Sequence, residues 1–130
     1  MSVLLLGPQD TEEGLDLLFA LESVLPPGEI ELFEDWVALH ARLSKPPIYD
    51  NVAVLMIRNA SDAVNLQILR KALRDLRCVV VLTEDRQWLL KAAYSVYPRY
   101  VGLSIPGHEL VKEITRRLYE QRLNIQGIRR

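Results

Sequence analysis

One uninterrupted apolar run, Val52-Ala53-Val54-Leu55-Met56-Ile57, indicates the fold. Two similar runs flank it along the chain, Val3–Leu6 before it and Cys78–Leu82 after it. In a strand that helices cover on both sides, successive side chains point to opposite faces and all of them are buried. We therefore expect these three runs to be central strands of one sheet.

Two further strands and five helices are expected around these runs. Residues 29–34 alternate apolar and acidic side chains, which is typical of a half-exposed edge strand, and residues 100–105 form a less regular fifth strand. A βα unit repeated five times requires a parallel sheet with right-handed crossovers. The strand order 2-1-3-4-5 puts the acidic strand at an edge, so we predict an α/β, flavodoxin-like (βα)5 three-layer sandwich. The helices are expected to begin near Asp10, Asp35, Ser61, Arg86 and Pro106.

The helical spacing predicts which side chains face the sheet. In the first helix the inward stripe is Leu15, Leu18, Phe19 and Leu25, widened by Leu17, Leu21 and Val24. In the last helix it is Leu110, Val111, Ile114 and Leu118. We expect residues 1–123 to form one domain and residues 124–130 to be a flexible tail.

The composition is that of a soluble globular protein. The chain has 130 residues, 16 bases against 17 acids, and one cysteine, so neither a disulfide framework nor a cysteine-rich zinc site is possible. This balance makes a nucleic-acid partner unlikely, and the apolar start is too short for a signal core or a membrane span. We expect a cytoplasmic protein without a cofactor or a metal.

The charges are unevenly distributed. Residues 1–50 hold ten acids and two bases, whereas residues 51–130 hold seven acids and fourteen bases. One explanation is an acidic first helix that lies beside a basic last helix in the same molecule. The alternative is self-association of an acidic surface with a basic one.

Over residues 2–122 the chain resembles the receiver domain of bacterial two-component response regulators. Val79–Thr83 is similar to the receiver's fourth strand, which ends in a Ser or Thr, and Leu103–Pro106 is similar to the end of its fifth strand. The resemblance implies a signalling domain, with a cis peptide bond before Pro106.

The resemblance also implies a phosphorylation site, and the residues that should form it are replaced. Gly7 and Pro8 stand where the family has two metal-binding acids, Met56 stands where it has the phosphoacceptor aspartate, and Ile105 stands where it has a lysine. Phosphoryl transfer to a carboxylate needs that acceptor and a divalent cation held by acids. We therefore expect a degenerate, or pseudo-, receiver that signals without phosphorylation and is not an enzyme. Its residual pocket consists of Gly7, Pro8, Met56, Thr83, Ile105 and Pro106.

A protein-interaction surface is predicted on the fourth helix. Aromatic and apolar side chains extend beyond its inward stripe, which is typical of interface centres. Receivers commonly pair through helix four, strand five and helix five, so the resemblance implies a homodimer. The alternative is that loops or the third helix cover these rings. The candidate interface is Trp88, Leu90, Tyr94, Tyr97 and Tyr100.

Two other functions remain open. A small-ligand sensor would bind at the carboxyl ends of the strands, near Met56 and Thr83. A hydrolase would use Ser104 with His108, but the glycine pattern and the order of the triad do not fit. His40 and His108 are otherwise expected to be solvated, and Cys78 to be buried.

Overall fold

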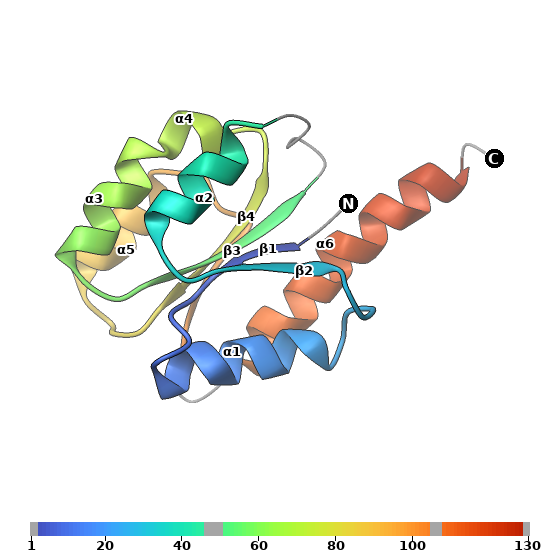
Figure 1. The fold of residues 1–130 in the computed structure, drawn as a ribbon, viewed down its shortest axis with the longest axis horizontal. Coiled ribbons are helices and arrows are strands. Elements are labelled where there is room, and N and C mark those ends of the chain that lie inside the picture. Colours follow the sequence, from blue (N-terminus) through green and yellow to red (C-terminus); the bar gives the residue numbers. More distant parts are fainter. Residues whose placement is uncertain (1–2, 46–50, 105–107, 129–130) are drawn as a thin grey trace.

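The computed structural model describes residues 3–45, 51–104 and 108–128 and confirms the predicted topology. The five strands are parallel and lie in the order β2-β1-β3-β4-β5 (Figure 1). They are β1 (Val3–Leu6), β2 (Ile30–Phe33), β3 (Val52–Ile57), β4 (Arg77–Leu82) and β5 (Tyr100–Leu103). The helices are α1 (Glu12–Glu22), α2 (Trp36–Leu43), α3 (Ala60–Ile68), α4 (Arg70–Leu73), α5 (Gln87–Tyr94) and α6 (Glu109–Ile128).

The sheet separates two apolar cores, as the alternation of buried side chains requires. Leu17 and Leu21 of α1 and Val111 of α6 pack on one face, whereas Leu39 of α2, Leu66 of α3 and Leu89 of α5 pack on the other. Every residue of β1 and β3 is buried, and β2 is the half-exposed edge. Within the described residues, no helix is long and apolar enough to span a membrane.

Two helices begin at residues other than the expected ones. Thr11, not Asp10, caps α1, because its backbone is extended and its Oγ1 accepts a hydrogen bond from the Gly14 N–H at 3.1 Å. Asn59, not Ser61, caps α3, and its Oδ1 accepts from the Asp62 N–H at 2.9 Å. Asp35 caps α2 as predicted.

The inward-facing apolar stripes of α1 and α6 contain fewer residues than predicted. Leu15 and Phe19 were expected to face inward, but they are 38% and 61% exposed. A Cβ at Gly14 would lie 1.8 Å from the Pro8 carbonyl oxygen, so α1 approaches the preceding loop with its glycine face. Leu110 of α6 was also predicted to be inward, and it is 56% exposed.

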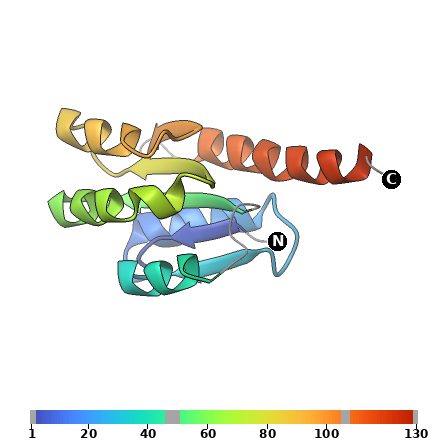
Figure 2. The ribbon, with the colours of Figure 1, turned by 90° about the horizontal axis from the view of Figure 1, so that it is seen from above.

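Three elements differ in extent from the prediction. The single expected third helix is interrupted at Leu69, which gives α3 and α4. Helix α5 ends at Tyr94, and Tyr97 has a left-handed backbone conformation with a φ of 52°. Helix α6 continues to Ile128 and projects beyond the sheet (Figures 1 and 2), so most of the expected tail is helical.

Candidate functional site

The candidate site lies at the carboxyl edge of the sheet, where β1 and β3 end side by side. Leu6 pairs with Leu55, and the Gly7 N–H donates to the Phe33 carbonyl oxygen at 3.1 Å. Gly7 and Pro8 are both buried. The loops that follow the strands therefore form the rim of the edge, as in other open α/β sheets.

Met56 is a core residue rather than a rim residue. Its side chain is 1% exposed and packs with the core beneath α1 and α6. The first residue after β3 is Arg58, which is half-buried. A cationic side chain therefore occupies the rim directly after the third strand.

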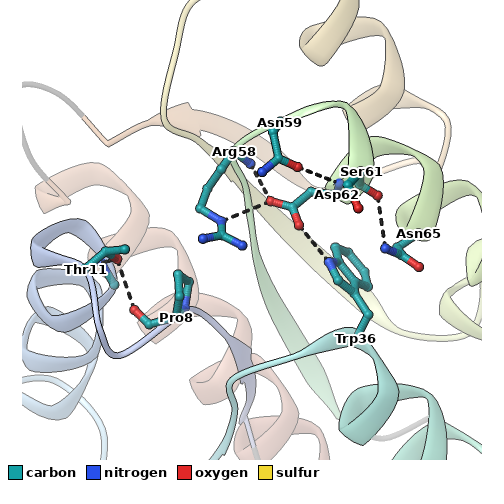
Figure 3. Close-up of polar contacts among 9 residues, drawn as sticks. Pro8, Thr11, Trp36, Arg58, Asn59, Ser61, Asp62 and Asn65 are labelled. Atoms are coloured by element: carbon teal, nitrogen blue, oxygen red, sulfur yellow. Dashed lines mark hydrogen bonds and ion pairs between the residues drawn. The ribbon is translucent and has the colours of Figure 1, made fainter.

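Arg58 holds a buried carboxylate at this rim (Figure 3). Asp62 is 3% exposed, and its Oδ2 accepts from the Arg58 backbone N–H at 2.8 Å and from Arg58 Nε at 3.1 Å. Its Oδ1 accepts from Trp36 Nε1 at 2.9 Å. The carboxylate thus joins the β3–α3 turn to α2, and three donors satisfy it.

The sequence reasoning missed this Arg58–Asp62–Trp36 network. The helix cap at Asn59 turns the chain back after β3, so that Asp62 lies over the rim. The available signal was the spacing of four residues between Arg58 and Asp62, which suits an ion pair within one helical turn. Nothing in the sequence indicated Trp36 as the third member.

A small hollow of about 190 Å³ adjoins the network. Three of its ten lining residues are acids, but Asp35 caps α2 and Asp62 is paired with Arg58. No cluster of three or more His, Cys, Asp or Glu that could hold a metal ion occurs among the described residues. The lining residues are Leu6, Pro8, Glu34, Asp35, Trp36, Met56, Arg58, Asn59, Ser61 and Asp62.

The remaining predicted pocket residues do not all meet at this hollow. Thr83 is half-buried after β4, and its N–H donates to the Ile57 carbonyl oxygen at 3.2 Å, but it does not line the hollow. Ile105 and Pro106, with the peptide bond that joins them, lie outside the described residues.

The predicted interface residues lie on different surfaces. Trp88 is 46% exposed and lines a groove between α3 and α5. Leu90 lies about 200° around the helix from it, on the side that also carries Tyr94, which is 57% exposed. Tyr97 is 85% exposed, whereas Tyr100 packs against the core beneath α6.

The two histidines differ in solvent exposure. His40 is exposed as expected, but His108 is only 8% exposed. Burial lowers the pKa of His108, and this effect outweighs the opposing influence of the Asp16 carboxylate and of a hydrogen bond to the Glu13 backbone. The expectation of a solvated His108 was therefore wrong.

Ser104 and His108 do not form a catalytic pair. Ser104 Oγ and His108 Nδ1 are both buried and have no hydrogen-bond partner among the residues that the structure describes. A serine nucleophile needs a base within hydrogen-bonding distance. Cys78 is buried as predicted, and burial raises the pKa of its thiol to about 12.

Comparison with known proteins gives structural matches only. No family model and no curated protein sequence matches the chain. A putative pilus assembly-related protein of Burkholderia pseudomallei aligns with a TM-score of 0.64 at 13% identity, over 93% of this chain and 91% of that one. A phosphorylated cyanobacterial phytochrome response regulator aligns with a TM-score of 0.63 at 15% identity, over 94% of each chain. A response regulator receiver domain from Rhodospirillum rubrum aligns with a TM-score of 0.62 at 15% identity, over 90% of each chain.

These matches and the strand order establish the fold class. The chain has the flavodoxin-like fold of response-regulator receiver domains. At its carboxyl edge this receiver-like domain carries the Arg58–Asp62–Trp36 network.

Proposed function

We propose that this chain is a phosphorylation-independent, non-enzymatic signalling domain of the pseudo-receiver type, which acts in the cytoplasm through protein contacts. The supporting observation is the Arg58–Asp62 ion pair, with Nε and Oδ2 3.1 Å apart, directly after β3. In this proposal residues 1–123 form the functional unit, and it needs no cofactor or metal.

The electrostatics of the rim oppose phosphoryl transfer. Asp62 lies beside the end of β3, and its three hydrogen bonds occupy three of the roughly four lone-pair sites of its carboxylate, two on Oδ2 and one on Oδ1, which weakens it as a nucleophile. Arg58 places a positive charge at the rim, which repels a divalent cation there, and Gly7 and Pro8 supply no carboxylate. A fixed ion pair instead holds the loops in one arrangement.

The proposal is tested with acetyl phosphate and Mg²⁺, followed by intact-mass spectrometry. The mass of the wild-type chain is expected to stay unchanged, while a receiver domain with an aspartate acceptor, treated in parallel, gains one phosphoryl group. A stoichiometric phosphoryl adduct on Asp62, Asp35 or Glu34 would contradict the proposal.

Symmetric pairing through α5, β5 and α6 is the second part of the proposal. Tyr94, Leu103 and Leu110 are large apolar side chains on this face, and they are 57%, 39% and 56% exposed. Sedimentation at about 0.5 M NaCl, where contacts between exposed charges are screened, should show a dimer that Tyr94→Glu converts to a monomer. Val37→Glu, at a 79% exposed position on α2, is the matched control and should leave the dimer intact. A wild-type chain that does not dimerise would refute this part alone.

A small-ligand sensor is the second candidate function, because the hollow lies at the predicted carboxyl edge and Met56 lines it. Its volume of about 190 Å³ is below the ~300 Å³ at which ligand pockets usually begin. Only a ligand of a few heavy atoms fits. A thermal-shift screen of such compounds should show stabilisation that Arg58→Ala abolishes if this candidate is correct.

A further inference from the structure

A second surface of the molecule, between α3 and α5, is apolar and basic. A hollow of about 250 Å³ is lined by Val64 and Gln67 of α3 and by Trp88 and Lys91 of α5, over a floor of alanines. Val64, Trp88 and the adjoining Ile68 are 59%, 46% and 67% exposed. The exposed bases at its α4 end are Arg70, Lys71 and Arg74, and with Val64, Gln67, Ile68, Trp88 and Lys91 they make up the basic groove.

The outward face of α1 has the opposite character. Phe19 and Leu15 lie one turn apart in the middle of this face, and Phe19 is 61% exposed. Exposed acids surround them, and no base occurs in the helix. This acidic ridge consists of Glu12, Leu15, Asp16, Phe19 and Glu22.

Among the residues that the structure describes, the charges of both surfaces form no ion pair within the molecule. None of the ion pairs between described residues uses an acid of α1 or a base of α4 or α5. Helix α6 lies beside α1, but Arg116 and Arg117 pair with Glu113 and Glu120 of their own helix. The basic last helix therefore does not neutralise the acidic first helix among these residues.

The topology prevents the two surfaces from meeting in one molecule. Helix α1 packs on one face of the sheet, and α3 and α5 pack on the other. Their charges and their exposed apolar side chains complement each other across two copies. We propose that the acidic ridge of one copy docks into the basic groove of the next copy, with Phe19 against Trp88, Val64 and Ile68.

This contact is heterologous, since each copy contributes a different surface. Repetition gives a head-to-tail chain or a ring, not a closed two-fold dimer. The contact goes beyond the proposed signalling function and uses neither the carboxyl edge of the sheet nor the α5–β5–α6 face. It can therefore be tested in a Tyr94→Glu background, where the symmetric pairing is removed.

The test is a mixing experiment with full-length variants followed by sedimentation velocity. In the Tyr94→Glu background, Phe19→Glu blocks the ridge and Trp88→Glu blocks the groove. Each variant alone should be monomeric, with association weakened at least about tenfold. An equimolar mixture should form a one-to-one complex, because the first variant keeps an intact groove and the second keeps an intact ridge.

Salt and charge variants provide the second measurement. The Tyr94→Glu protein without a blocking substitution should form oligomers at about 0.05 M NaCl that dissociate at about 0.5 M NaCl. Asp16→Lys and Lys91→Glu change exposed charges without altering the core, and each should weaken the oligomers. Val37→Glu introduces a glutamate, as the two blocking substitutions do, but it lies outside both surfaces and should leave the oligomers intact.

The proposal would be overturned by a Tyr94→Glu protein that stays monomeric at low salt. It would also be overturned by a mixture of the two blocked variants that forms no complex, or by blocked variants that associate as the parent does. Loss of association in the Val37→Glu control would also overturn it, because the effect would then not be specific to the two surfaces.

Discussion

Replacement of Asp62 by alanine should destabilise the protein by about 3 kcal/mol. The side chain is 3% exposed and accepts hydrogen bonds from Trp36 Nε1 and from the backbone and side chain of Arg58. Removal leaves two partly buried N–H groups without an acceptor, at about 1–3 kcal/mol each. The Arg58 side chain is 38% exposed, so water compensates for part of its loss and the total stays near the lower end.

The assay is urea denaturation followed by tryptophan fluorescence, with thermal melts in parallel. For a chain of this length, about 3 kcal/mol corresponds to a fall in Tm of about 10 °C. Asp62→Asn keeps one acceptor oxygen and should lose about half as much. Asp75→Ala, at an exposed acid, should change the free energy of unfolding by less than about 0.5 kcal/mol.

A double-mutant cycle with Trp36→Phe isolates one bond of the network. The two substitutions should be non-additive by about 1 kcal/mol, because both remove the same hydrogen bond. Two results would contradict this role of Asp62: a loss of stability as small as that of Asp75→Ala, or an additive cycle. Either result would mean that the carboxylate does not join α2 to the β3–α3 turn.

Three further predictions concern individual buried groups. Gly14→Ala should cost at least about 2 kcal/mol in urea denaturation, because the new Cβ would lie 1.8 Å from the Pro8 carbonyl oxygen; full stability would contradict the close approach. The lowered pKa of His108 means that the unfolded chain binds a proton more readily, so stability should fall as the pH drops below about 6.5, and His108→Gln but not His40→Gln should remove this dependence. Because burial raises the thiol pKa of Cys78 to about 12, a thiol reagent should label it only as fast as the protein unfolds, and immediate labelling of the native chain would refute its burial.

The sequence was sufficient to predict the strands of the sheet, because a strand that is buried on both faces is a continuous run of apolar residues. Each run of continuous apolar residues, such as Val52–Ile57, became a strand buried on both faces. The acid-flanked strand became an edge, as the predicted order 2-1-3-4-5 requires. These inferences needed only local patterns and the handedness of βα units.

The helix faces were less predictable, because apolar periodicity does not reveal the exact phase of a helix. Four of the eleven residues of α1 are leucines, and they lie on more than one side of the helix, so both Leu17 and Phe19 fitted an inward stripe. Only the close approach at Gly14 decided that Leu17 is inside and Phe19 outside. The same ambiguity on α5 hid the fact that Trp88 and Tyr94 lie on different sides.

The sequence alone shows that Gly7 and Pro8 follow β1 and that Arg58 and Asn59 follow β3, so no acid comes directly after either strand. What occupies the rim depends on the packing of the helices. A cap at Asn59 set the phase of α3, and that phase brought Asp62 within hydrogen-bonding distance of Trp36, which is 26 residues away along the chain. Contacts between residues so distant in sequence depend on how helices pack on the sheet, and no local pattern records that packing.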